Sequence, residues 1–286
     1  MIFRISHKTN YSYSAPVFLE PHIIHLTPRN DGCQKISNFF FAVEPQPAGM
    51  HHYLDAEGNN TVCIWFEEKT AGLSISTSFE AQTFCMNPFG YFVIDNDFLK
   101  LPAIYEKNDQ AALKPFLASI DIDSEVTNFG KSIFENSNGV TLEFLSRLCM
   151  AIYENFKVEI REYGPPFSPV VTFQNKRGPC RDLVILFMAV CRNFGLATRF
   201  VSGYQEGDPD MDQRHLHAWA EVYIPGGGWR GYDPSHGLVV ADRHIALAAS
   251  HDPAGIAPVK GNFRGTGVSA TTNYLISLSA VADKQK

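Results

Sequence analysis

The strongest hydrophobic signal in the chain is an unbroken apolar run of nine residues from Leu183 to Cys191. Gly178 and Pro179 stand just before this run, and Gly195 stands just after it. Glycine permits a sharp bend of the backbone, proline brings no N–H in need of an acceptor to a helix start, and glycine also suits the left-handed residue beyond a helix end. The pattern predicts a helix that begins near residue 180, and because this helix is apolar on all sides, it should be buried.

The first 105 residues show a different pattern, in which apolar and polar positions alternate over short runs such as Phe3 to His7. Clusters of glycine, asparagine, aspartate and proline separate these runs. Alternation with a period of two is typical of strands that bury one face, and short strands at this spacing predict an antiparallel sandwich. His51 and His52 are neighbours, and because adjacent strand residues point to opposite faces, we expect a position on a loop surface and no metal.

The rest of the chain mixes helical and strand patterns. Residues 106–138 have the spacing of a helical linker, and Thr141 is a candidate cap for the helix that follows. A proline-rich loop from Tyr163 to Gln174 leads to the central helix. Further strands are predicted at Ala197–Tyr204, His217–Ile224, Trp229–Tyr232 and about residues 266–281. We therefore expect an α+β protein of two domains, a β-rich domain over residues 1–105 and a domain over residues 106–286 whose buried helix packs on an antiparallel sheet.

Composition narrows the functional classes. The chain has 286 residues, 45% of them hydrophobic, and a formal net charge of -6 without a basic block, so we expect no nucleic-acid partner. The longest apolar run is too short to cross a bilayer, and the first ten residues lack the apolar stretch of a signal peptide. None of the six cysteines shows C-x-x-C spacing, so we expect free thiols and a cytoplasmic protein without a membrane partner.

Cys180 stands where the predicted helix begins. The N-terminus of a helix carries about half a positive charge and N–H groups without partners, and both stabilise a thiolate. Arg177 and Arg181 flank the cysteine and act in the same direction. The position indicates an activated nucleophile, and the alternative is a buried cysteine that only fills core space.

A second pair of motifs offers partners for a nucleophile, H-A-W-A-E at His217–Glu221 and G-Y-D-P at Gly231–Pro234. In a strand, His217 and Trp219 share one face. Asp233 lies on the return strand of the same hairpin, and a register that pairs residue 217 with residue 233 places the imidazole within reach of the carboxylate. The neighbouring register would put the two side chains on opposite faces.

Together these residues form an apparatus for attack on an amide or ester carbonyl. Cys180 would supply the nucleophile, His217 would take its proton, and Asp233 would fix the imidazole tautomer. The backbone N–H of Cys180 is a candidate donor to the oxyanion. A zinc site is one alternative, with a ligand set of His215, His217 and either Asp233 or His236. Taken alone, His217 could also be an ordinary half-buried histidine and Asp233 a turn residue, but only nucleophilic catalysis explains all three positions together.

At these motifs the chain resembles the transglutaminase-like family of papain-like cysteine enzymes, and most closely its bacterial members with an N-terminal β domain. The matching segments are R-G-P-C-R-D, C-R-N-F-G-L-A-T-R-F-V-S-G-Y, H-A-W-A-E-V-Y-I-P-G-G-G-W and G-Y-D-P-S. H-K-T-N-Y-S-Y-S-A-P-V near the start and D-R-H-I-A-L-A near the end extend the resemblance over most of the chain. The resemblance implies a papain-like core with a triad of Cys180, His217 and Asp233.

The resemblance also implies a cysteine hydrolase, a protease or amidase that acts on a peptide or protein and needs no cofactor and no metal. We expect Trp219, Tyr204 and Tyr163 to contact the substrate. Arg181 stands where the bacterial relatives often have glutamine, and no tryptophan that could donate to the oxyanion stands close upstream of the cysteine. Two alternatives remain, an acyl transferase that cross-links proteins and a protein-binding scaffold whose triad is a relict.

Overall fold

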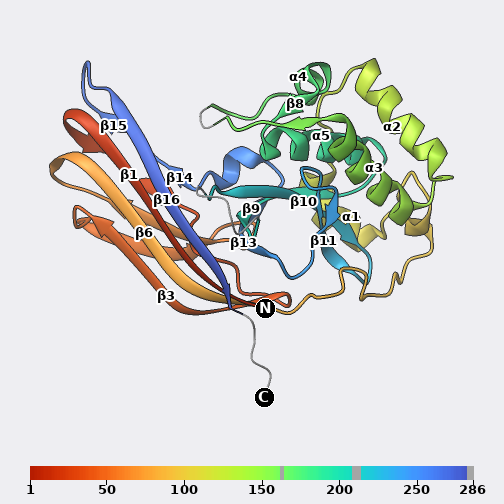
Figure 1. Ribbon diagram of the computed structural model, residues 1–286, viewed down its shortest axis with the longest axis horizontal. Coiled ribbons are helices and arrows are strands. Elements are labelled where there is room, and N and C mark those ends of the chain that lie inside the picture. Colours follow the sequence, from red (N-terminus) through yellow and green to blue (C-terminus); the bar gives the residue numbers. More distant parts are fainter. Residues whose placement is uncertain (162–163, 208–213, 282–286) are drawn as a thin grey trace.

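The structure, a computed structural model, describes residues 1–161, 164–207 and 214–281. A five-stranded sheet stands in the middle, with helices packed on one side and a β-sandwich on the other (Figure 1). Two large apolar clusters hold these layers together. One lies between the helices and the central sheet, and the other lies between the sandwich and the same sheet. The predicted α+β fold class is confirmed.

The sandwich consists of two antiparallel sheets. Its strands are β1 (Ile2–Leu19), β2 (His22–Ile24), β3 (Gln34–Glu44), β4 (Gly49–Leu54), β5 (Asn60–Trp65), β6 (Lys69–Thr83), β14 (Val259–Lys260), β15 (Phe263–Arg264) and β16 (Ala270–Val281). The first sheet has the order β15-β1-β6-β3 with β16 also paired to β1, and the second has the order β14-β2-β5-β4. Ile5, Ile64 and Ile75 from the two sheets are buried in one core. The predicted antiparallel sandwich is confirmed, although β1 and β6 are longer than the short runs suggested.

The C-terminal segment returns to the sandwich, because β16 pairs with β1 over its whole length. This corrects the predicted assignment of residues 266–281 to the second domain. Conversely, Phe98 and Tyr105 are buried in the helical core, so the chain leaves the sandwich before residue 105. Strand pairing and burial act over any distance in the sequence, and a single boundary therefore does not separate the two cores.

All described helices except η3 lie between residues 97 and 193, and η3 follows the strands of the central sheet. The helices are η1 (Asp97–Leu99), α1 (Lys107–Leu113), η2 (Lys114–Leu117), α2 (Ser124–Asn136), α3 (Thr141–Asn155), α4 (Pro169–Asn175), α5 (Cys180–Asn193) and η3 (Pro253–Ile256). The prediction that Thr141 caps α3 is wrong. Thr141 is the first residue of this helix, and its hydroxyl donates to the carbonyl oxygen of Phe98. The helix α4 lies inside the predicted proline-rich loop, and Ser168 caps it. Within the described residues, no helix is long and apolar enough to cross a membrane.

The central sheet has five strands, which are β9 (Thr198–Gln205), β10 (His217–Ile224), β11 (Gly228–Asp233), β12 (Leu238–Val239) and β13 (His244–Ser250). Their order is β12-β11-β10-β9-β13. The helix α5 packs against β9 and β10. Both β9 and β13 are buried along almost their whole length, because the helices cover one face of the sheet and the sandwich covers the other.

The helix α5 agrees with the prediction at both ends. Cys180 is its first residue, and every residue from Asp182 to Arg192 is buried. Beyond its end, Gly195 has a φ of 76°, in the left-handed region that favours glycine. A Cβ at this position would lie 2.7 Å from the carbonyl oxygen of Ala103, so close packing also requires glycine here.

Two of the six cysteines are joined in a disulfide, Cys33 and Cys85. Cys33 precedes β3 and Cys85 follows β6, and because these strands pair antiparallel, the two Cα atoms lie 5.2 Å apart, a spacing typical of disulfides. The expectation that all cysteines remain thiols is therefore wrong for this pair. The free cysteines are Cys63, Cys149, Cys180 and Cys191.

Candidate active site

Cys180 lies at the mouth of α5. The short parallel pair of β7 (Lys157–Val158) and β8 (Arg177–Gly178) leads the chain to this point, and Pro179 precedes the helix with extended backbone. The carbonyl oxygen of Pro179 accepts from the N–H of Asp182 at 2.9 Å, so Cys180 lies within the first turn of the helix. Cys180 is half-buried, and the N–H of a first helical residue has no carbonyl one turn earlier to which it can donate.

His217 begins β10, Asp233 ends β11, and the imidazole Nε2 lies 2.7 Å from Oδ2 of the carboxylate. The register differs from the predicted one. Ala220 pairs with Tyr232, so the same ladder continued sets residue 233 opposite residue 219 and diagonal to residue 217. The observed partner of residue 233 is thus two positions from the predicted one. Because two is an even number, the side chains of His217 and Asp233 still share one face, and the predicted contact forms across the diagonal.

The side chain of Cys180 contacts the imidazole of His217 as well. His217 makes a side-chain hydrogen bond with Cys180 as well as with Asp233, and since Asp233 holds Nε2, Nδ1 is the nitrogen left for the thiol. Burial alone would lower the pKa of His217, but the charge of Asp233 and these hydrogen bonds raise the pKa to about 10. The structure thus brings the three predicted residues together in the order thiol, imidazole, carboxylate, with the imidazole charged at neutral pH.

Asp233 is fully buried and accepts hydrogen bonds on both oxygens. Its Oδ2 lies 2.7 Å from Nε2 of His217, 3.0 Å from Nδ1 of His236 and 3.0 Å from Nε2 of His244. Its Oδ1 accepts from the N–H and the hydroxyl of Ser235 at 3.1 and 2.6 Å. Burial would raise the pKa of Asp233, but the charge of His217 and the three imidazole hydrogen bonds hold it well below its usual range. Sequence reasoning assigned no role to Ser235 or His244, although Ser235 follows the D-P motif and His244 lies within the D-R-H-I-A-L-A segment of the resemblance.

This cluster bears on the zinc alternative. The ligand atoms of His217, Asp233 and His236 lie within 4.8 Å of one another, so the described residues offer three groups of the kinds that zinc binds. His215 is not among these three residues, and its Nδ1 is hydrogen-bonded to the hydroxyl of Tyr274 at 2.5 Å. The imidazole nitrogens share Oδ2 of Asp233 as their acceptor, so hydrogen bonds alone account for the cluster.

The first turn of α5 also holds the segment that precedes α4. The carboxylate of Asp182 accepts from the guanidinium of Arg161 at 2.9 Å and from the N–H of Phe167 at 3.1 Å. Burial raises the pKa of Asp182, against the opposing effect of these donors. Arg181 donates to the carbonyl oxygens of Arg161 and Gly164 at 2.7 and 3.3 Å. Arg181, which we expected to act on Cys180 through its charge, therefore also anchors a segment beside the nucleophile.

Two of the three residues predicted to contact the substrate, Trp219 and Tyr204, are buried. Trp219 is 1% exposed and packs edge-on against His244, with ring centroids 5.1 Å apart. Tyr204 is equally buried, and its hydroxyl is hydrogen-bonded to Nδ1 of His7 at 2.8 Å. Neither side chain presents a surface to a substrate in this structure: Trp219 packs with Val201, Ala246 and Ala249, whereas Tyr204 joins the apolar cluster of the sandwich. Tyr163 lies outside the described residues.

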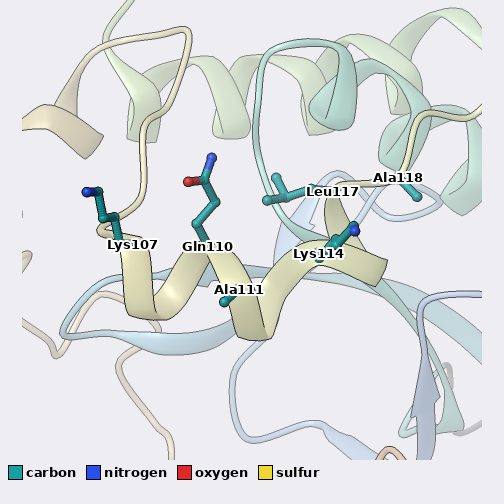
Figure 2. A pocket seen from close by; sticks show the side chains of 6 residues that line it. All are labelled: Lys107, Gln110, Ala111, Lys114, Leu117 and Ala118. Carbon is teal, nitrogen blue, oxygen red and sulfur yellow. The ribbon is translucent and has the colours of Figure 1, made fainter.

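An open hollow of about 620 Å³ lies along α1 and η2. Figure 2 shows its lining side chains, which are Lys107, Gln110, Ala111, Lys114, Leu117 and Ala118. None of Cys180, His217 and Asp233 is among them. The hollow therefore contributes nothing to the candidate active site.

Comparison with known families agrees with the fold and the motifs. Residues 3–82 match the bacterial transglutaminase-like N-terminal region, and residues 127–234 match the transglutaminase-like superfamily. The second match contains Cys180, His217 and Asp233. Residues 127–234 thus resemble the core of the transglutaminase-like superfamily, and residues 3–82 resemble the N-terminal region of its bacterial members.

Similar proteins span nearly the same length. An uncharacterised protein of Mycobacterium leprae (strain TN) is 24% identical over 277 residues, which cover 93% of this chain and 94% of that protein. An uncharacterised protein of Mycobacterium tuberculosis (strain ATCC 25618 / H37Rv) is 28% identical over 283 residues, which cover 91% and 86%. The crystal structure of "a putative cysteine protease from Cytophaga hutchinsonii" matches with a TM-score of 0.75 and 21% identity, over 100% of this chain and 92% of that one. At this identity the likeness establishes the fold.

Proposed function

We propose that this protein is a cysteine hydrolase that cleaves a peptide or amide bond through a thioester intermediate. The observation that carries the proposal is the chain of contacts from Cys180 through His217 to Asp233. These residues come from α5, β10 and β11, so three separate elements each contribute one side chain to the same site. A buried nucleophile alone, or a half-buried histidine alone, would not require this convergence.

In the proposed reaction, the sulfur of Cys180 attacks the carbonyl carbon of the substrate, and His217 holds the proton that the thiol has lost. His217 then gives this proton to the leaving amine, and a thioester remains on Cys180. Water attacks the thioester, His217 accepts a proton from the water, and release of the carboxylic acid returns the proton to the sulfur. Asp233 holds Nε2 of His217, which keeps Nδ1 toward the sulfur throughout.

The exposure of the three residues supports this division of roles. Cys180 is half-buried and the side chain of His217 is 12% exposed, whereas Asp233 is fully buried. A substrate can therefore reach the sulfur and the imidazole but not the carboxylate. The N–H of Cys180, at the positive end of α5, is the donor that we propose for the oxyanion.

The test offers the full chain a mixed library of peptides and reads new termini by mass spectrometry. We expect cleavage by the wild type and none by Cys180→Ala, while Cys63→Ala, which removes a free cysteine of the sandwich, should cleave at the wild-type rate. Hydroxylamine should capture the thioester as a hydroxamate. Cleavage that persists in Cys180→Ala would contradict the proposal, and an amide product formed with glycine methyl ester in place of the acid would assign the acyl transferase instead.

A further inference from the structure

Two imidazoles that contact Asp233 have no part in the proposed reaction. His236 and His244 each place a ring nitrogen 3.0 Å from Oδ2, the oxygen that also bonds His217. A carboxylate oxygen offers about two lone-pair directions, so three N–H donors compete for it. The two extra histidines differ in their setting, because the side chain of His236 is 41% exposed and that of His244 only 3%.

His244 reaches this carboxylate from a distant part of the fold. It is the first residue of β13, and β9 and β10 lie between β13 and β11 in the central sheet. Its ring meets that of Trp219 edge-on at 5.1 Å and lies 5.9 Å from the ring of His217. Trp219 is itself buried. This packing restrains the imidazole of His244 in the orientation that points Nε2 to Asp233.

The protonation state of His244 follows from its surroundings. The carboxylate of Asp233 only accepts hydrogen bonds, so Nε2 of His244 must carry the proton. Burial lowers the pKa of His244, against the opposing effect of Asp233, and the ring is neutral. Nδ1 of His244 is buried and has no hydrogen-bond partner in the described part of the chain. His244 is thus a neutral donor, which restrains Asp233 without placing a second positive charge beside His217.

We propose that His244 is a positioning residue of the active site: its Nε2–H holds the carboxylate of Asp233 and competes with His217 for Oδ2. The inference rests on the proposed function, in which Asp233 orients His217. Without the donor of His244, the carboxylate loses a restraint, and reactions of Cys180 that depend on an oriented His217 slow down. His217 then competes for Oδ2 with His236 alone, so its bond to Asp233 strengthens and the pKa of His217 rises further.

The test measures the reaction of Cys180 with iodoacetate and needs no identified substrate. Iodoacetate is an anion, so a neighbouring imidazolium favours its attack by the thiolate, and the rate falls as the pH rises through the pKa of His217. In His244→Phe, which keeps a ring and removes the donor, we expect the rate at neutral pH to fall about tenfold. The alkaline decline should move up by about one pH unit. His244→Gln keeps an N–H at similar reach and should restore both values toward the wild type.

A matched control separates positioning from a general loss of packing. His22 is also buried, but its Nδ1 is hydrogen-bonded to the carbonyl oxygen of Glu20 in the sandwich, and His22→Phe should leave the profile of Cys180 unchanged. An unshifted alkaline decline in His244→Phe would overturn the proposal. The same conclusion would follow if His244→Gln reacted as slowly as His244→Phe.

Ring-nitrogen NMR of the wild type keeps the proposal testable if His244→Phe does not fold. A proton on Nε2 of His244 and none on Nδ1 supports it, and a charged ring or the opposite tautomer overturns it. Failure of the proposed function would appear differently, as iodoacetate labelling of Cys180 that is the same in the wild type and in His217→Ala.

Discussion

The sandwich and the central sheet are both antiparallel, yet they bury their residues in different ways. In the sandwich, β6 alternates between buried and partly exposed positions, whereas β9 and β13 in the central sheet are buried at almost every position. Polar side chains on the partly exposed face of β6 can turn to water, but those of β9 and β13 must find partners inside the protein. The candidate active site lies at the end of the sheet with two covered faces, where charges and hydrogen bonds act most strongly on one another.

The largest effect that this comparison predicts belongs to Asp233→Asn. The amide would offer an N–H to His217 and favour the wrong tautomer, so the rate of peptide cleavage should fall by about 10⁴-fold. Asp123 is a matched control, because its carboxylate caps α2 by accepting from the N–H of Val126 at 2.9 Å, and asparagine caps a helix equally well. Asp123→Asn should cleave at the wild-type rate. A loss of less than about tenfold in Asp233→Asn would remove Asp233 from the mechanism.

The next effect contrasts one ion pair from each region. Glu221 on β10 accepts from Nε of Arg199 at 2.6 Å with both side chains nearly buried, whereas Glu80 on β6 accepts from Nε of Arg4 at 2.8 Å close to solvent. Glu221→Gln leaves the charge of Arg199 buried, so the free energy of unfolding should fall by about 3–5 kcal/mol. Glu80→Gln should change the free energy of unfolding far less, because solvent screens this exposed pair. Urea unfolding measures both values, and equal losses would refute the contrast.

A smaller effect is expected at the disulfide of the sandwich. Cys33 and Cys85 are 52 residues apart in the sequence, and the bond between them restricts the unfolded chain. Cys85→Ser should lower the free energy of unfolding by about 2–4 kcal/mol and leave the reaction of Cys180 with iodoacetate unchanged. Alkylation of the unfolded, unreduced wild type should reveal the four free thiols. Six alkylated cysteines would show that the disulfide does not form.

Features that depend on neighbouring residues could be predicted from the sequence. Cys180 at the start of a buried helix and Gly195 beyond its end follow from the apolar run and the glycines around it. The shared face of His217 and Asp233 follows from the parity of strand positions. The register itself could not be predicted, because it depends on where β11 begins after the turn, and the ladder sets residue 228 opposite residue 224.

Features that depend on contacts between residues far apart in the chain could not be predicted from the sequence. The disulfide depends on the pairing of β3 with β6, and the return of the chain to the sandwich depends on the pairing of β16 with β1. The contact of His244 with Asp233 requires the place of β13 in the central sheet. Burial of Trp219 and Tyr204 has the same origin, since strand periodicity cannot tell that both faces of a sheet are covered.

The most direct test of the central claim, that His217 activates Cys180, is the pH dependence of iodoacetate labelling at each cysteine in the wild type and in His217→Ala. The pKa of His217 is raised from 6.5 to about 10, so its positive charge is present at neutral pH and lost as the pH rises through 10. We predict fast labelling of Cys180 at neutral pH that declines near pH 10 in the wild type. Cys149 and Cys191, whose thiol pKa values are raised by burial, should stay unlabelled in the folded protein. In His217→Ala, labelling of Cys180 should be slow and show no alkaline decline, and an identical rate and profile in the two proteins would contradict the account.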